Sequence, residues 1–347
     1  MTLLKAYRQT LRLKTAQVKK FLSEITYSHL CMNIMPTVLE QGFRNRAKFK
    51  IFGNPRKFEV KGTDPLSGEI PASEAIWILP GWGRKLVSDT IGVISQNLSG
   101  YWVDGFEVQL THGNKHAHLI LFVKRSKRRS YAELADLLLA KIPSLKGVSI
   151  PSQKSDFGEP YLLHAIRGKN IFSHHDAFFQ SNIQLTPRLL EDVQKKSQKI
   201  SFRRIIDLFC GVGLFSLFLT KNDTEIIGVD NSKKAIESAR RNADYQGIGR
   251  ASFICSSVET YTHRARLFPD DFVLIDPPRS GCASSLIETI ASHRPHSVCS
   301  ISCCLKTHIR DLKDWIKRGY SIQSFSAFDM FPFTEFLETV ALLAKKP

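Results

Sequence analysis

The sequence predicts an α/β protein in which a doubly wound sheet, ending in an antiparallel hairpin, forms the C-terminal half and an α+β region precedes it. Apolar, β-branched runs alternate with helical patterns from residue 178 onward, as in repeated βα units. A Gly-rich turn joins an early strand of this series to a helix, and two neighbouring strands end the series. Since 347 residues suffice for two domains, we expect one over residues 1–172 and the other over residues 173–347.

The composition is that of an ordinary globular protein with an unusual charge. Lys and Arg number 49 against 32 Asp and Glu, which gives a net charge of +17 and a pI near 9.6. This imbalance predicts a polyanionic partner, RNA or DNA, because solubility alone accounts for it poorly. No apolar run has membrane-spanning length, and the N-terminus lacks the apolar core of a signal peptide. We expect a cytoplasmic monomer with no membrane and no protein partner.

The α+β region begins with basic patterns. Residues 4–25 predict a basic amphipathic helix that packs against its own domain. Residues 44–51 alternate cations with apolar residues and pair with 57–61 as a hairpin, whose cationic face is either a phosphate-contacting surface or a solvated one. Residues 62–100 are rich in Gly, Pro and Ser, so we expect loops around one short helix.

A second hairpin follows, built from residues 106–111 and 116–123. The densest positive run of the chain, KRSKRR at 124–129, comes directly after it and predicts a nucleic-acid contact. A capping box, Ser130-Tyr131-Ala132-Glu133, then predicts a helix through about residue 141.

The cysteines and histidines do not form a metal-binding pattern. The seven cysteines are few and odd in number, and only Cys31 precedes residue 200, which favours reduced thiols over disulfides, zinc or an iron–sulfur cluster. The clustered histidines have no cysteine or acid at ligand spacing, so we expect surface or turn histidines and no metal. They are His112, His116, His118, His174 and His175.

The C-terminal half alternates strands and helices after a helical pattern that ends near residue 199. The expected strands cover residues 202–208, 226–230, 252–255, 272–275, 297–302, 322–328 and 337–344, and the expected helices cover 214–219, 232–243, a stretch after 281, and 306–317.

The turn Asp207–Phe215, DLFCGVGLF, lies between a strand and a helix. Gly211 lets a ligand approach the backbone, and Asp230, nineteen residues further on, can accept hydrogen bonds from ribose hydroxyls. A dinucleotide requires a pyrophosphate cradle, and the third glycine for it is missing, so S-adenosylmethionine fits this turn better. An NAD-dependent oxidoreductase is an alternative, but it leaves the charge and the strand-end residues unexplained.

Reactive side chains follow other strands at their ends, where open α/β sheets bind ligands. Asp276, in the stiff turn DPPRSG, is expected to face the crevice. Cys303 or Cys304 lies at a strand end directly before a helix, where the helix start favours a nucleophilic thiolate. Glu338 begins an otherwise apolar strand and is a candidate general base, with Glu335 as the competing candidate.

The motifs FFQSN, DLFCGVG, GVD, DPPRSG, SCC and FPFTEFLE, in this order, resemble those of the S-adenosylmethionine-dependent RNA uracil-5-methyltransferases, the TrmA/RlmC-like family. The similarity extends upstream through residues 40–50 and the basic helix, and it looks closest to the RlmC branch, which acts on 23S ribosomal RNA. The resemblance implies a Rossmann-like class I methyltransferase domain behind an RNA-recognition region, with S-adenosylmethionine as cofactor. The implied substrate is a uridine in RNA, with ribosomal RNA as the first expectation and transfer RNA as the alternative.

The resemblance also implies roles for individual residues. Cys303 matches the nucleophile that adds to carbon 6 of uracil, and Glu338 matches the base that removes the proton from carbon 5. The target uridine must leave any stacked helix to reach them. Asp276 and Gln180 are further implied to orient the uracil edge. The cofactor-binding positions are Gln180, Phe209, Gly211, Asp230 and Asp276.

The chain departs from the family pattern in three places. RlmC-like proteins carry a cysteine-ligated iron–sulfur cluster near the N-terminus, but only Cys31 is present there, so we expect no cluster. Cys304 stands where Asn usually follows the nucleophile, and Phe333 and Phe336 replace histidines of the last motif. These departures leave a second hypothesis open, a binding protein that kept the fold and basic surface but lost catalysis.

Overall fold

The computed structural model describes residues 3–27, 30, 33–39, 42–54, 57–64, 68–97, 102–123, 131–221 and 223–346. The chain forms two compact units, each treated by itself. The C-terminal unit comprises Met1–Thr37, Ala177–Phe179 and Leu185–Pro347, and the central unit comprises Val38–Asp176 and Gln180–Gln184. Cys31 and the basic run 124–129 lie outside the described residues. The expected division into an RNA-recognition region and a catalytic domain at residue 172 stays a prediction.

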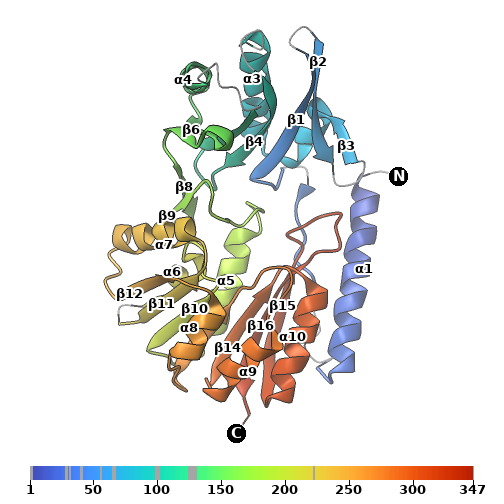
Figure 1. Cartoon of the computed structure of the whole chain (residues 1–347). Coiled ribbons are helices and arrows are strands. Elements are labelled where there is room, and N and C mark those ends of the chain that lie inside the picture. The colour runs from blue at the N-terminus through green and yellow to red at the C-terminus, as the bar shows by residue number, and fades with distance from the viewer. Residues whose placement is uncertain are drawn as a thin grey trace. The chain divides into compact units, whose positions relative to one another are not determined.

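The C-terminal unit contains a seven-stranded sheet in the order β12-β11-β10-β13-β14-β16-β15 (Figure 1). Its strands are β10 (Arg204–Leu208), β11 (Glu225–Asp230), β12 (Ala251–Cys255), β13 (Asp271–Ile275), β14 (Ser297–Ser302), β15 (Tyr320–Phe328) and β16 (Glu338–Lys345). Only β16 runs against the others, since it pairs antiparallel with both β14 and β15. The predicted fold class, a doubly wound sheet that ends in an antiparallel hairpin, is confirmed.

Helices cover both faces of this sheet. One face carries α5 (Thr186–Ser197), α6 (Leu214–Leu219) and α7 (Lys233–Tyr245), and the other carries α1 (Leu3–Glu24), α8 (Val258–Arg264), α9 (Ser284–Ser292) and α10 (Leu305–Lys317). The second face holds a large apolar core in which Val18, Phe21 and Leu22 of α1 pack with residues of the sheet and of α8, α9 and α10. The helix α1 begins and ends close to the predicted bounds, whereas α8 was not predicted.

The central unit contains a mixed seven-stranded sheet in the order β3-β2-β1-β4-β5-β6-β7 and the separate hairpin β8–β9. Its strands are β1 (Arg46–Asn54), β2 (Lys57–Asp64), β3 (Gly68–Pro71), β4 (Val103–Leu110), β5 (Ala117–Val123), β6 (Leu145–Ile150), β7 (Ser155–Gly158), β8 (Tyr161–Ile166) and β9 (Lys169–His174). Its helices are α2 (Ala72–Ala75), η2 (Ile76–Ile78), α3 (Gly81–Asn97), α4 (Ala132–Lys141) and η3 (Pro151–Gln153). Both predicted hairpins, β1–β2 and β4–β5, are confirmed.

The prediction of loops over residues 62–100 is wrong, because this stretch contains the 17-residue helix α3. Its glycines suggested loops, but Gly83 serves close packing. A Cβ at Gly83 would lie 2.4 Å from Cδ1 of Leu110, so the helix can approach the sheet only without a side chain there. The helix α4 begins at Ala132, and the side chain of Tyr131 before it makes no capping hydrogen bond to the helix. The predicted capping residue, Ser130, lies outside the described residues.

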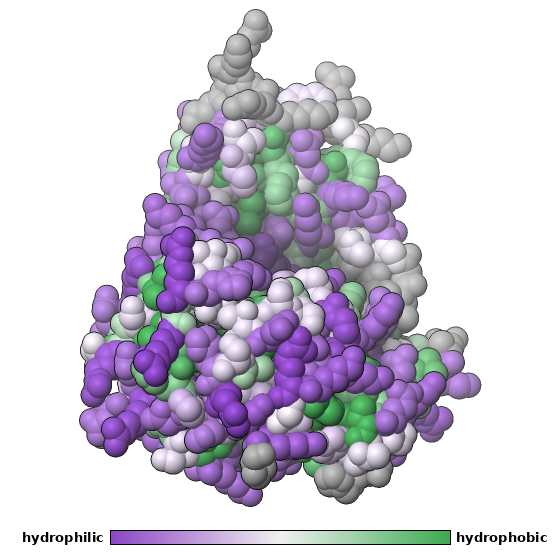
Figure 2. Space-filling view, turned by 60° about the horizontal axis from the view of Figure 1, so that its bottom comes forward, coloured by the Kyte–Doolittle hydropathy of each residue, from purple (hydrophilic) through white to green (hydrophobic). Residues whose placement is uncertain are grey.

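The cations of β1 are exposed as predicted, but two of them are paired. Arg46 forms an ion pair with Glu107, and Lys50 forms one with Glu69. Hydrophilic residues cover most of the face seen in Figure 2, with apolar residues in scattered patches. Among the described helices, none has both the length and the apolar character needed to cross a membrane.

Candidate active site

The turn after β10 is shaped for close approach of a ligand. Phe209 has a φ of 63°, a conformation that costs a non-glycine residue roughly 1–2 kcal/mol. Gly211 and Gly213 also have positive φ, at 54° and 78°. A Cβ at Gly213 would lie 3.1 Å from the ring of Phe253, whereas a Cβ at Gly211 would meet no atom within 4 Å. The open space is therefore at Gly211, the predicted cofactor position.

Asp230, at the end of β11, joins this turn to the start of α7. Its Oδ2 accepts a hydrogen bond from the Gly211 backbone N–H at 3.0 Å, and its Oδ1 accepts one from the Ser232 N–H at 2.8 Å. Each carboxylate oxygen has a further lone pair, so these bonds orient the side chain and leave acceptor capacity for ribose hydroxyls.

Three carboxyl groups gather at the carboxyl ends of β10, β11 and β13. Leu208 is in register with both Val229 and Ile275, which brings the residues that follow these strands to one edge of the sheet. Burial, together with the charges of Asp207 and Asp230, raises the pKa of Asp276 to about 7. The pKa of the fully buried Asp207 is also raised to about 7 by burial, against a hydrogen bond from the Ser216 N–H.

A cluster of acids that includes two with raised pKa values favours a positively charged ligand, because a cation stabilises the carboxylate form of each acid. S-adenosylmethionine carries a sulfonium and an ammonium group, so these residues fit it. An uncharged ligand would leave the acids repelling one another. Sequence reasoning gave Asp207 no role, although an acid inside the apolar run of β10 was the same kind of signal that pointed to Glu338.

Cys303 directly follows the last residue of β14, and Glu338 is the first residue of the neighbouring strand β16. The last pair of their antiparallel ladder joins Ser302 to Thr339, the residues next to Cys303 and Glu338. The predicted nucleophile and the predicted base therefore lie near each other at this end of the ladder, and the charge of Glu338 acts on the pKa of Cys303.

Glu338 has the environment of a general base. It is only 2% exposed, and its Oε1 is buried with no hydrogen-bond partner in the described part of the chain. Burial, followed by the charge of Asp276, raises the pKa of Glu338 well above its ordinary value. A buried carboxyl oxygen without a partner is costly, which suggests that a substrate group completes the site. The competing candidate, Glu335, is exposed.

The expectation that the helix start favours a thiolate at Cys303 is wrong for the free protein. Burial raises the pKa of the Cys303 thiol to about 12, and the charges of Glu338 and Asp276 act in the same direction. The guanidinium of Arg279 opposes them, and it lies 3.8 Å from the ring centre of Phe336. The positive end of α10 lowers the pKa of this thiol too little to offset burial beside two carboxyl groups.

Gln180 belongs to the central unit, and its predicted cofactor role stays a prediction. It is buried, and its backbone oxygen accepts hydrogen bonds from Nδ2 of Asn45 and Nε2 of His112, both at 3.2 Å.

The expectation of surface or turn histidines is wrong about exposure for four of the five, since His112, His118, His174 and His175 are at most 4% exposed and His116 is half-buried, although His112 lies in a bend and His175 in a turn. Their burial was misjudged because an imidazole can be buried where its nitrogens find partners, as both nitrogens of His118 do.

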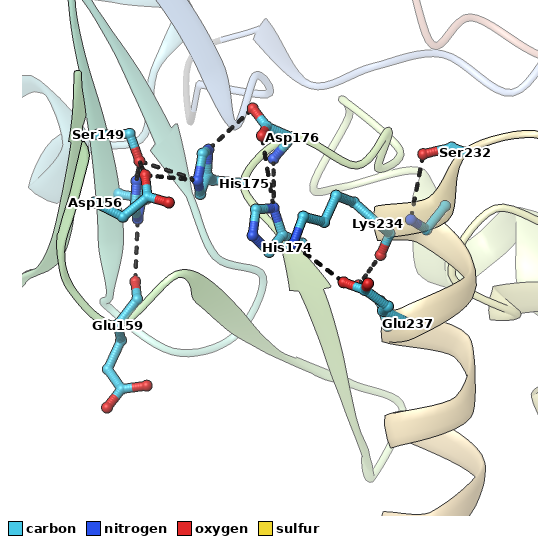
Figure 3. Close-up of polar contacts among 12 residues, drawn as sticks. Ser149, Asp156, Glu159, His174, His175, Asp176, Ser232, Lys234 and Glu237 are labelled. Carbon is cyan, nitrogen blue, oxygen red and sulfur yellow. Dashed lines mark hydrogen bonds and ion pairs between the residues drawn. The ribbon is translucent and has the colours of Figure 1, made fainter. Parts of the chain in front are cut away.

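Figure 3 shows part of their network, which is centred on Ser149. The Ser149 hydroxyl lies 2.5 Å from Asp156, 2.7 Å from Nε2 of His118 and 3.0 Å from Nε2 of His175.

Three neighbouring residues meet one condition for a metal site. The ligand atoms of His174, His175 and Asp176 lie within 4.8 Å of one another. However, Nδ1 of His174 already accepts a hydrogen bond from the Asp176 N–H at 3.1 Å, so its lone pair is engaged by the backbone. These residues suit a hydrogen-bond network better than a metal, and the expectation of no metal stays a prediction.

The sheet order, the open turn at Gly211 and the acid cluster define a Rossmann-like methyltransferase unit. A family model described as tRNA (Uracil-5-)-methyltransferase matches residues 152–346, more than half of the chain. The chain belongs to this family of S-adenosylmethionine-dependent RNA uracil-5-methyltransferases, as its motifs predicted, and it is an enzyme of that family.

Individual relatives agree with this assignment. The chain is 27% identical, over 97% of its length and 92% of the relative's, to the 23S rRNA (uracil(747)-C(5))-methyltransferase RlmC of Shewanella baltica OS185. It is 31% identical, over 65% of its length and 52% of the relative's, to an uncharacterized RNA methyltransferase of Nostoc sp.. The crystal structure of the Pyrococcus abyssi tRNA (uracil-54, C5)-methyltransferase with S-adenosyl-L-homocysteine shares its fold, with a TM-score of 0.73, 20% identity, and coverage of 97% of this chain and 83% of that one.

Proposed function

We propose that this protein methylates carbon 5 of a uridine in ribosomal RNA, with Cys303 as the nucleophile and Glu338 as the base. The observation that carries this proposal is the β14–β16 ladder, whose last pair, Ser302 with Thr339, is followed by Cys303 on one side and by Glu338 on the other. Glu338 is a buried carboxyl group with an oxygen that has no hydrogen-bond partner among the described residues. The similarity to a 23S rRNA methyltransferase over 97% of the chain supports ribosomal RNA as substrate.

The cofactor, when bound, supplies the methyl group as an electrophile. We propose that Phe209, Gly211, Asp230 and Asp276 bind it, together with Gln180, and that Asp276 and Gln180 also orient the uracil edge. The protein is expected to work as a monomer and without an iron–sulfur cluster.

The remaining steps belong to the protein and the uracil. The thiol of Cys303 gives its proton to water, and the thiolate forms a bond to carbon 6 while the electron pair of the carbon 5–carbon 6 double bond moves to form an enolate. Carbon 5 then gains the methyl group. Glu338 takes the proton from carbon 5, the double bond re-forms, and the thiolate leaves carbon 6. Glu338 must be ionised when it accepts this proton, so its raised pKa makes it a strong base once the site is occupied.

The test is transfer of labelled methyl groups to unmodified 23S rRNA and tRNA transcripts. We expect product only with 23S rRNA, and Cys303→Ala should abolish it. Glu338→Gln should lower turnover by a factor on the order of 10²–10⁴, the usual contribution of a general base. This variant should also accumulate a denaturation-resistant protein–RNA adduct, because the sulfur cannot leave until the proton is removed.

Three outcomes would change the proposal. Turnover retained in Cys303→Ala would exclude the covalent route. Transfer to tRNA alone would replace the substrate. Tight RNA binding without product or adduct, including with 5-fluorouridine RNA, would favour a binding protein that has lost catalysis.

A further inference from the structure

A groove of about 470 Å³ lies within the C-terminal unit between α1 and the start of α10. Its walls include Lys20 and Phe21 of α1, Cys304 and Lys306 at the start of α10, and Glu335 from the turn before β16. Figure 1 shows α1 alongside α10. The volume lies in the range of ligand-binding clefts, roughly 300–1,000 Å³. The residue roles proposed above leave this groove unused.

The charges in the groove favour an anion. Lys20 and Lys306 are exposed, and no hydrogen bond or ion pair of either ammonium group is found in the part of the chain that the structure describes. The acid of α1 that lines the groove, Glu24, is 3.4 Å from Lys313 and so is offset. Glu335 is then the one lining acid without such a partner among the described residues, against two cations.

The groove also has an apolar part and an open helix end. Ile309 is half-buried and gives it apolar surface on which a base or ribose can pack, whereas Phe21 belongs to the buried core behind it. Cys304 occupies the position before the first residue of α10, and its side chain makes no capping hydrogen bond. The positive end of this 13-residue helix therefore adds to the attraction that the two lysines exert on an anion.

The position of the groove says which anion it would receive. Cys304 directly follows Cys303, and Glu335 lies three residues before Glu338. An RNA strand that places one base at Cys303 brings the adjacent nucleotide to the residues that neighbour Cys303. A phosphodiester with a flat base also matches two cations above an apolar wall, and the net charge of +17 favours a polyanion over an acidic peptide as the partner.

We propose that this groove binds the nucleotide adjacent to the target uridine, with Lys20 and Lys306 contacting its flanking phosphates. This site rests on the proposed function, since it takes the same RNA strand as Cys303. Its role is to hold the strand in register, so that one particular uridine of a loop reaches the sulfur.

The test removes both cations, in Lys20→Gln/Lys306→Gln, and measures binding of a fluorescein-labelled ten-uridine RNA by anisotropy. Each phosphate contact with a single strand contributes about 0.7 to the slope of log affinity against log salt. The slope should therefore fall by about 1.4, and affinity at about 0.1 M salt should weaken on the order of ten-fold. In methyl transfer, KM for RNA should rise while kcat at saturating RNA stays within about two-fold.

The matched control is Lys19→Gln/Lys317→Gln, which removes two exposed cations from the same two helices outside the groove. If both double variants lost the same RNA affinity, the loss would be an effect of general surface charge, and the proposal would be overturned. Glu335→Gln should strengthen binding instead. The binding assay needs no turnover, so a protein that fails to methylate but shows the slope change would refute the proposed function and not the groove.

Discussion

At the scale of single residues, electrostatics decides what the active site can bind. Asp207 and Asp276 hold raised pKa values because each is buried near other carboxyl groups. Below those pKa values the acids are neutral, and above them they are ionised and attract a cation. Cofactor binding should therefore depend on pH in a range where isolated carboxyl groups do not titrate.

The first prediction concerns cofactor affinity. The Kd for S-adenosylmethionine should rise as pH falls from about 8.5 through the carboxyl pKa values, which both lie near about 7. S-adenosylhomocysteine lacks the sulfonium charge, so its Kd should change less over the same range. Isothermal titration of the two ligands at several pH values measures both. Equal pH dependence of the two ligands would contradict this assignment.

The second prediction concerns thiol reactivity. The pKa of Cys303, raised to about 12, leaves little thiolate in the free protein at pH 7.5. Alkylation by iodoacetamide should therefore modify the exposed Cys255 before Cys303. Peptide mass mapping over time gives the order. Modification of Cys303 first would mean that the thiol is already activated without RNA.

The sequence gives candidates for this site where a residue type is informative by itself. A cysteine at a strand end and an acid in an apolar strand identified Cys303 and Glu338 as candidates, and the end of the β14–β16 ladder lies next to both. The pKa of Cys303 was misjudged because it depends first on burial and then on Glu338 and Asp276, which are far away in sequence. The same holds for the buried histidines, whose hydrogen-bond partners come from other strands.

At the scale of elements, α1 is anchored to the turn that precedes β16. Lys14 of α1 forms a buried ion pair with Asp329 at 2.6 Å and also donates to the backbone oxygen of Phe331 at 3.0 Å. Tyr7 packs on Phe333 at 5.5 Å between ring centres, and its hydroxyl accepts from the Thr37 N–H. These contacts hold the turn from which Glu338 begins.

The third prediction tests this anchor. Lys14→Met leaves the carboxylate of Asp329 buried without its cation, which costs about 3–5 kcal/mol in unfolding free energy. Lys14→Met/Asp329→Leu should lose much less, because no isolated charge stays buried. Thermal and urea midpoints of the three proteins measure this. If the single and double variants were equally stable, the ion pair would not be what holds α1 against this turn.

Secondary structure was predicted best where periodicity is strong. The strands of the C-terminal sheet and its helices other than α8 were found, because β-branched runs and turn residues mark them. The 17-residue helix α3 was expected only as one short helix among loops, since its glycines, Gly83 among them, serve packing against another element. Strands β6 to β9 carry mixed polar residues that are buried only through partners from distant strands, so their pattern gives little signal.

At the scale of the whole molecule, the net charge of +17 governs encounters with RNA. Proteins that make 6–10 phosphate contacts lose about 10³–10⁵ in affinity between about 50 and about 200 mM salt.

The fourth prediction is that affinity for a 23S rRNA transcript falls by at least about a hundred-fold over that salt range. The Kd for S-adenosylmethionine, whose proposed binding residues are mostly half-buried and therefore less screened than surface charges, should change by less than about three-fold over the same range. Filter binding and calorimetry measure the two. A flat salt response for RNA would leave the basic surface without a role in binding.

The pairing of Lys14 with Asp329 also bears on how the chain is made, since 315 positions separate the two residues. The helix α1 leaves the ribosome with its apolar side chains unburied, and at 5–20 residues per second roughly 15–60 s pass before Asp329 has been synthesised. The turn between β15 and β16 cannot take its final form before α1 and Asp329 meet. The environment of Glu338 is therefore completed only after synthesis has passed this turn.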